Sequence, residues 1–236
     1  MITVRVTDLQ SGCYSETFLK LKTSSQPHIN KPPNLYACDN GNGISTFDTS
    51  LIEEELIGNQ QGLSISYFDG NGEQLPSPLP LNYQNTKPWK QTVYIRVENE
   101  LSALCFSETS FELITNPLPE IILEDEYVLC ALEPMLQLSS NLDYDTWQWA
   151  FEDGSIVSNS ADVNLIDAGT YTLKVSKTRD GIACENSISF RLVRSVLPVI
   201  EEVKIQDISA NNYIEIISSG DGDFEYSVDG INYQDN

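Results

Sequence analysis

The chain has 236 residues, and 35 acidic residues against 13 Lys and Arg give it a formal net charge of -22. This excess of negative charge opposes binding to nucleic acid or to anionic lipid, because both require clustered cations. No apolar run approaches the roughly 18 residues that a membrane-spanning helix needs. The composition therefore predicts a solvated acidic surface, no nucleic-acid partner and no membrane insertion.

One segment occurs three times, and each copy is predicted to form a β-hairpin. Apolar residues alternate over residues 2–6, 93–97 and 171–175, which is typical of half-buried strands. A polar turn and a second alternating strand follow, and in the first copy that strand ends at Leu21. In each copy a cysteine precedes apolar residues by 6 and 8 positions, a proline by 14 and an isoleucine by 16. This regularity indicates a tandem array.

The repeat divides the chain into two complete modules and two fragments. Met1 falls where the other copies have Thr92 and Thr170, inside a strand, so we expect the first segment to be the C-terminal hairpin of a truncated module. Prolines in the linkers restrict the backbone, and we expect the modules to form a rod. The expected ranges are residues 1–26 (first segment), 27–118 (second module), 119–197 (third module) and 198–236 (last segment, the N-terminal part of a further module).

The third module carries features of an immunoglobulin-like β-sandwich. Asp167, Gly169 and Tyr171 resemble the D-x-G-x-Y approach to strand F of that fold, and the tyrosine is expected in the core. Trp147 and Trp149 fall on a mid-module strand and project on the same face. Core packing is the favoured role for both tryptophans, and sugar stacking is the alternative.

A short helix in the second module is the one expected departure from β-structure. Ser50 and Glu53 have the spacing of a capping box, and Gly58 can close the C-terminus. Between them lies a short apolar stripe at positions 51, 52, 56 and 57. The predicted fold class is therefore all-β, with tandem immunoglobulin-like sandwiches and one helical insertion.

The five cysteines are isolated in sequence, which excludes zinc-site spacing and favours disulfides formed in an oxidising compartment. Two patterns compete. One joins cysteines 25 residues apart, Cys13 with Cys38 and Cys105 with Cys130. The other joins cysteines of one module, Cys38 with Cys105 and Cys130 with Cys184. Because the first strand of a sandwich can run beside the last, we predict the second pattern, which leaves Cys13 without a partner.

The loop 39–48 is the best candidate for a metal site. Oxygen-bearing side chains on a glycine-bent loop, closed by a downstream carboxylate, suit calcium. Glycine occupies positions where ligand side chains should stand, so a surface turn with an Asx cap is the alternative. The calcium ligands would be Asp39, Asn40, Asn42 and Asp48.

Catalytic motifs are absent from the sequence. There is no nucleophile elbow, zinc-protease motif or phosphate-binding loop, and the single histidine, His28, adjoins the linker residue Pro27. We therefore predict that the chain is not an enzyme. We also expect it to bind no cofactor, unless calcium binds to it.

Four stretches resemble the tandem immunoglobulin-like or PKD-like repeats of gliding-adhesin-like bacterial surface proteins exported by type IX secretion. The resemblance implies an extracellular or cell-surface location and a stalk or adhesin role. In that family such repeats precede a C-terminal sorting domain, so the signal peptide and sorting domain are expected outside this piece. The chain departs from the pattern at Ser209, where the modules have a cysteine. The stretches are residues 35–48, 83–99, 116–119 and 224–234.

The favoured function is a non-catalytic stalk or display segment of a secreted or cell-surface adhesin-like protein, with neighbouring modules of the same chain as partners. The alternative is an accessory module of a larger secreted enzyme that binds a carbohydrate or another surface ligand. Burial of Trp147 and Trp149 would favour the stalk, and an exposed aromatic platform would favour the alternative.

Overall fold

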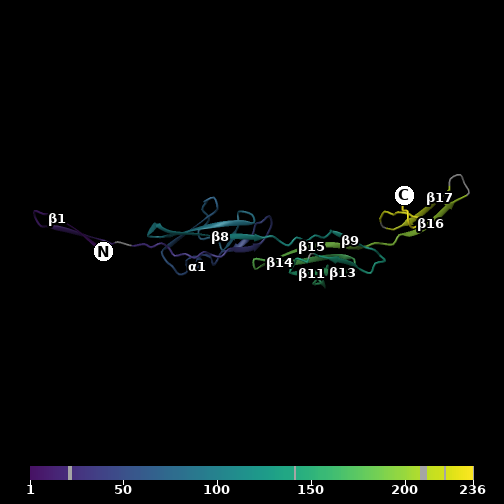
Figure 1. The fold of residues 1–236 in the computed structure, drawn as a ribbon, viewed down its shortest axis with the longest axis horizontal. Coiled ribbons are helices and arrows are strands. Elements are labelled where there is room, and N and C mark those ends of the chain that lie inside the picture. Colours follow the sequence, from purple (N-terminus) through teal and green to yellow (C-terminus); the bar gives the residue numbers. More distant parts are fainter. Residues whose placement is uncertain (21–22, 141, 208–211, 221, 236) are drawn as a thin grey trace. The chain divides into compact units, whose positions relative to one another are not determined.

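Over the residues that it describes, the computed structural model confirms an all-β fold with one short helix (Figure 1). It describes residues 1–20, 23–140, 142–207, 212–220 and 222–235. The chain divides into two compact units, Met1–Pro117 with Arg179–Ile182, and Leu118–Thr178 with Ala183–Asn236. Leu21 and Ser209 lie outside the described residues. No described helix is long and apolar enough to cross a membrane.

The second module contains two sheets around one core. The larger sheet has the order β3-β8-β7-β5, and the smaller pairs β4 with β6. Side chains alternate along β7 between buried and outward positions, as the period-two pattern predicts. The bounds are β3 Leu35–Cys38, β4 Thr46–Asp48, β5 Leu63–Phe68, β6 Asn82–Gln84, β7 Lys90–Asn99 and β8 Ser102–Asn116. The core comprises Phe47, Ile52, Leu56, Tyr67, Leu79, Tyr83, Val93, Ile95, Val97, Phe111 and Leu113.

The third module repeats this arrangement with a five-stranded sheet of order β12-β11-β14-β15-β9 and a two-stranded sheet of β10 with β13. The bounds are β9 Glu126–Leu129, β10 Leu136–Ser139, β11 Thr146–Phe151, β12 Ile156–Ser158, β13 Asp162–Leu165, β14 Gly169–Arg179 and β15 Ile182–Arg194. Its core comprises Leu129, Trp149, Val163, Leu165, Tyr171, Leu173, Val175, Phe190 and Leu192.

The immunoglobulin-like signature of the third module is confirmed in detail. Tyr171 is 3% exposed and donates a hydrogen bond of 2.8 Å from its hydroxyl to the Asp167 carbonyl, which is a tyrosine corner. Trp149 is fully buried, and Trp147 is half-buried against the same core. The predicted core packing is therefore confirmed for Trp149 and partly confirmed for Trp147.

Helix α1 spans Ile52–Ile57, as predicted, but its capping box does not form. The N-cap is Leu51, without a side-chain hydrogen bond, so the prediction for Ser50 and Glu53 is wrong. The reason is local competition: the Asp48 carboxylate accepts the Ser50 backbone N–H at 2.9 Å and so holds Ser50 in a turn before the helix. Gly58 closes the C-terminus with φ 56°, as predicted.

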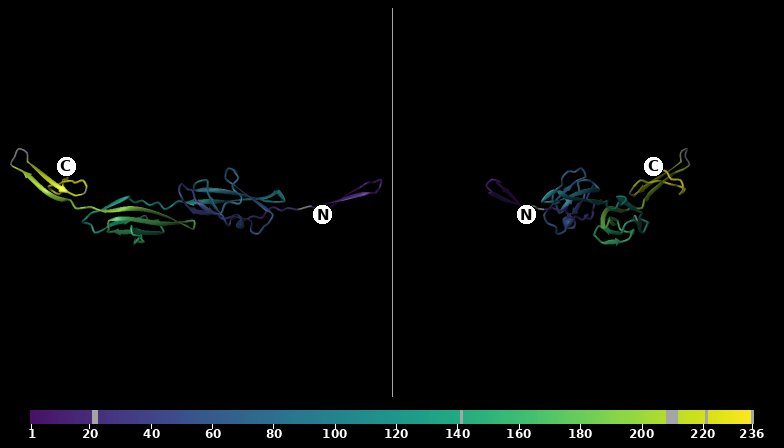
Figure 2. Two further views of the ribbon diagram at one scale, coloured as in Figure 1. Left: turned by 180° about the vertical axis from the view of Figure 1, so that it is seen from behind. Right: turned by 60° about the vertical axis from the view of Figure 1, so that its left-hand side comes forward.

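The chain begins and ends with separate hairpins (Figure 2). Strands β1 (Ile2–Thr7) and β2 (Tyr14–Leu19) form a two-stranded sheet, and so do β16 (Val199–Gln206) and β17 (Tyr213–Ser219). Every residue of β1 and β2 is exposed. Neither hairpin is covered by a second sheet within the described residues.

Candidate functional site

The cysteines are the candidate functional residues that the structure resolves most clearly. Cys38 and Cys184 are disulfide-bonded. Cys13, Cys105 and Cys130 are free, and Cys105 lies with its Sγ 3.3 Å from the Ser24 hydroxyl oxygen. The predicted pairs Cys38 with Cys105 and Cys130 with Cys184 are therefore wrong, because each contains one free thiol.

The direction of the first strand explains this error. Strand β3 does run beside the last strand of its module, but parallel to it, so Cys38 lies opposite Asn116. Cys105 lies eleven residues earlier on the same strand. At about 3.3 Å per residue this is roughly 36 Å, whereas the two Cα atoms of a disulfide are usually about 4.4–6.8 Å apart. The early cysteine and the hairpin cysteine of one module thus stand at opposite ends.

The third module shows the same separation. Strand β9 is parallel to β15, and Leu129 lies opposite Arg194. Cys130 follows this pair directly, while Cys184 lies ten residues before Arg194 on the same strand. A bond between Cys130 and Cys184 would require the sheet to come apart.

A buried polar network fixes the end of β3 that carries Cys38. The Ser45 hydroxyl donates a hydrogen bond to the Cys38 carbonyl, and the Asp39 N–H donates to the Asn116 carbonyl at 2.9 Å. Asn85 accepts from the Ser45 N–H at 2.7 Å and donates to the carbonyls of Gly43 and Lys87 at 2.9 and 2.8 Å. Ser45, Asn85 and Asn116 are all buried. Because buried polar groups are costly when unpaired, this satisfied network holds the strand end in one conformation.

The turn before Cys184 belongs to the compact unit that contains Cys38. Asn116 donates from Nδ2 to the Arg179 carbonyl at 3.0 Å. Asp180 and Gly181 have φ of 51° and 79°, the two positive values that a tight Asp-Gly hairpin turn requires. Cys184 follows three residues later and is 1% exposed. The sequence predicted a polar turn between the two hairpin strands but gave no specific signal for Asn116 as its contact.

The loop 39–48 forms a self-contained turn. One oxygen of the Asp39 carboxylate accepts the N–H groups of Gly41 and Gly43 at 2.9 and 2.8 Å. Asn40 and Asn42 lie within the same turn, and Asn42 has φ 58°. Asp48 lies on β4, where hydrogen bonds from Ser50 hold the pKa of its carboxyl below the usual value. Among the described residues no group of three His, Cys, Asp or Glu side chains is arranged to hold a metal ion.

Calcium is expected to leave the melting temperature of the protein unchanged. The Asp39 carboxylate already caps its own turn, so a cation would have to compete with two backbone N–H groups. Thermal unfolding with excess calcium, and again with a chelator, measures this directly. A rise in melting temperature with calcium that Asp39→Asn abolishes would instead establish Asp39, Asn40, Asn42 and Asp48 as a cation site.

Gly43 is expected to tolerate no side chain. Its φ is 79°, and a Cβ atom there would lie 2.7 Å from the Trp89 backbone nitrogen and 2.8 Å from Cδ2 of the Trp89 ring. We expect Gly43→Ala to lower the free energy of unfolding by about 2–4 kcal/mol, from backbone strain and overpacking together. Urea denaturation measures the loss. Gly70→Ala is the matched control, because only the flexible end of Lys87 approaches that site, at 3.3 Å. Equal losses in the two variants would contradict the prediction.

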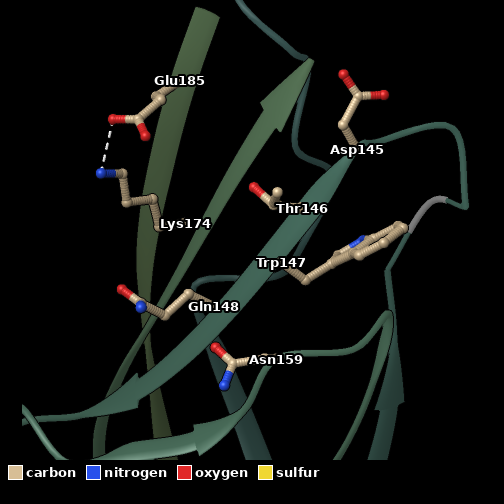
Figure 3. Close-up of a pocket in the computed structure, with 7 residues that line it drawn as sticks. All are labelled: Asp145, Thr146, Trp147, Gln148, Asn159, Lys174 and Glu185. Atoms are coloured by element: carbon tan, nitrogen blue, oxygen red, sulfur yellow. Dashed lines mark ion pairs between the residues drawn. The ribbon is translucent and has the colours of Figure 1, made fainter. Parts of the chain in front are cut away.

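A pocket of about 400 Å³ on the third module tests the ligand-binding alternative (Figure 3). Trp147 and Gln148 extend to opposite sides of β11, and Lys174, which pairs with Glu185 at 2.6 Å, lies on the side of Gln148. The Trp147 ring therefore extends away from the side chains of Gln148 and Lys174. Fully buried Trp149 cannot join Trp147 in an aromatic platform.

One family model matches within the chain. Residues 34–119 match the model described as "Flavobacterium inter-domain disulphide bond domain". No curated protein matches the chain. With the disulfide, the family match indicates an extracellular bacterial protein with immunoglobulin-like domains.

Solved structures similar to the chain include several tandem-domain proteins. Sidekick-1 immunoglobulin domains 1–4 share 15% identity at a TM-score of 0.38, covering 82% of this chain and 57% of that one. SGBP-B of the Bacteroides ovatus mixed-linkage glucan utilization locus, solved with a mixed-linkage heptasaccharide, shares 12% at 0.25, covering 86% and 64%. The N-terminal four Ig domains of Dscam1 share 10% at 0.24, covering 90% and 64%. The chain thus spans 57% to 64% of these three chains.

Proposed function

We propose that Cys38 and Cys184 bond to each other, and that this disulfide braces two consecutive modules of a non-catalytic stalk. The single observation that carries the proposal is the state of the five cysteines: two are disulfide-bonded and the other three are free. Cys38 belongs to the second module and Cys184 to the third. Their bond would cross the linker between residues 117 and 119.

The strand directions give this bond a structural purpose. Cys38 ends the first strand at the place where the chain leaves the second module, opposite Asn116. Cys184 lies near the start of the last strand of the third module, shortly after the turn that Asn116 contacts. Pro117 and Pro119 already restrict the linker backbone. A disulfide at the same place removes the remaining hinge freedom, and a rod that keeps its length is what a stalk requires.

Location and partners follow from the same features. Disulfides persist outside the cytosol. Two of the stretches that resemble type IX-secreted, gliding-adhesin-like surface proteins also lie at the end of the second module that carries Cys38. They are residues 35–48 and 116–119. We therefore assign the chain to a display segment of a cell-surface protein, with its own neighbouring modules as partners. Immunoglobulin-like folds host many functions, so the non-catalytic assignment depends on the lack of a catalytic motif.

A peptide map under non-reducing conditions tests the pairing. Cleavage after acidic residues places each of the five cysteines in its own peptide. We expect one disulfide-linked pair that contains Cys38 and Cys184. A linked pair of Cys38 with Cys105, or of Cys130 with Cys184, would overturn the proposal.

A further inference from the structure

Three exposed asparagines of the second module stand directly before a glycine: Asn40, Asn42 and Asn71. Asn-Gly bonds are prone to spontaneous loss of the side-chain amide, because glycine has no Cβ to hinder attack by its backbone nitrogen. That nitrogen attacks Cγ of the asparagine, a C–N bond forms, and ammonia leaves with the proton of the attacking nitrogen. Water then opens the resulting cyclic imide to aspartate or to isoaspartate. Whether the three asparagines survive in the folded chain depends on how the glycine nitrogens are held.

One carboxylate oxygen holds both attacking nitrogens of the loop 39–43. Oδ1 of Asp39 accepts the N–H of Gly41 at 2.9 Å and the N–H of Gly43 at 2.8 Å. These two nitrogens are the ones that would attack Asn40 and Asn42. Attack in the folded loop therefore requires that a hydrogen bond to a charged acceptor first be broken.

The charge on Asp39 opposes the same reaction in a second way. The glycine nitrogen becomes a nucleophile when it loses its proton and so becomes negative. A carboxylate beside it disfavours that charge. The carboxylate does not remove the proton itself, because an aspartate side chain is far too weak a base to deprotonate a backbone amide. Asp39 therefore keeps the proton on both nitrogens.

The third pair, Asn71 with Gly72, lies in the same module but does not involve Asp39. The Gly72 N–H donates to the Asp69 backbone carbonyl at 3.1 Å. Oδ1 of the Asp69 side chain accepts the N–H groups on either side, from Asn71 at 2.7 Å and from Glu73 at 3.0 Å. Asn71 is thus an internal reference, because its rate of deamidation reports opening of the module and not the state of the loop 39–43.

We propose that Asn40 and Asn42 are latent deamidation sites, and that Asp39 is the positioning residue that keeps them intact in the folded protein. The loop connects the strand that ends at Cys38 to the buried network around Ser45. Isoaspartate lengthens the backbone by one methylene group, so its formation in this loop would disturb that strand end. The proposal goes beyond the braced stalk and does not depend on the partner of Cys38.

The test incubates the 236-residue chain at mildly alkaline pH and measures deamidation of each asparagine by peptide mapping and mass spectrometry. The chain unfolded in guanidinium chloride supplies the unprotected rates. We expect Asn40 and Asn42 to react about tenfold or more slowly in the folded chain, because a hydrogen bond to a charged acceptor must break first. Asp39→Ala should raise both rates by about tenfold or more and leave the rate of Asn71 unchanged. The matched variant Asp48→Ala, which removes a carboxylate from β4 of the same module, should change none of the three rates.

Asp39→Asn distinguishes the hydrogen bonds from the charge. Its side-chain oxygen can still accept both N–H groups but is uncharged, so its rates at Asn40 and Asn42 should lie between those of the wild type and of Asp39→Ala. Rates above those of Asp39→Ala would contradict the role of the hydrogen bonds.

Three other results would overturn the proposal. Slower deamidation in Asp39→Ala would show that the carboxylate acts as a base. An equal increase at Asn71 would show that Asp39 only keeps the module folded. Rates at Asn40 and Asn42 that are the same in the folded chain and in guanidinium chloride would show that the loop protects neither residue.

Discussion

Trp149→Ala is expected to lower the free energy of unfolding of the third module by about 3–5 kcal/mol. The indole is fully buried and packs edge-to-face on Phe190, with ring centroids 6.1 Å apart. Its Nε1 donates to the Ser160 carbonyl at 2.9 Å. Alanine would leave a cavity between the two sheets and an unpaired carbonyl beside it, and the two costs act together.

Hydrogen exchange measured peptide by peptide assigns this loss to a module. We expect faster exchange in β11, β14 and β15 and unchanged exchange in β7 and β8, because the two modules have separate cores. Trp147→Ala is the matched control: Trp147 lies two residues away on the same strand and is half-buried, so its loss should be clearly smaller. Equal losses for the two tryptophans would contradict the assignment of Trp149 as the central core residue.

The features that the sequence predicted correctly are those set by local pattern. Period-two alternation located the hairpins, and the D-x-G-x-Y spacing placed Tyr171 in its corner, since both depend on residues close together in the chain. The capping box at Ser50 failed because a second local acceptor, the Asp48 carboxylate, accepts the Ser50 backbone N–H, which the Glu53 side chain of a capping box would accept. Local rules decide such a case only when every competing side chain is considered.

The cysteine pairing failed for a non-local reason. Whether β3 runs parallel or antiparallel to β8 decides which end of the module carries Cys38, and alternation along a strand contains no information about direction. The buried network of Ser45, Asn85 and Asn116 was missed for a related reason. An asparagine that satisfies buried backbone groups looks the same in sequence as one in a surface turn.

The double variant Cys38→Ser/Cys184→Ser is expected to lower stability by up to about 5 kcal/mol, the chain-entropy value for a loop of this length. The loss reaches that limit if the second and third modules unfold together. It is smaller if they unfold one at a time, because the disulfide then closes a shorter unfolded loop in each step. Both cysteines are replaced because a single serine would leave a thiol free for exchange. Differential scanning calorimetry measures the loss, and Cys105→Ser, which removes a thiol that is already free, should change nothing.

The same variant distinguishes a disulfide that restricts the linker from one that only stabilises the folded modules. If the disulfide removes a hinge at residues 117–119, its loss should broaden the distribution of distances between the two modules even under conditions where both stay folded. Spin labels placed on the exposed residues Glu54 and Asn164, one in each module, would report that distribution. A distribution that stays narrow without the disulfide would assign the stiffness to Pro117, Pro119 and the Asn116 contact with Arg179, and would leave the disulfide a role in stability alone.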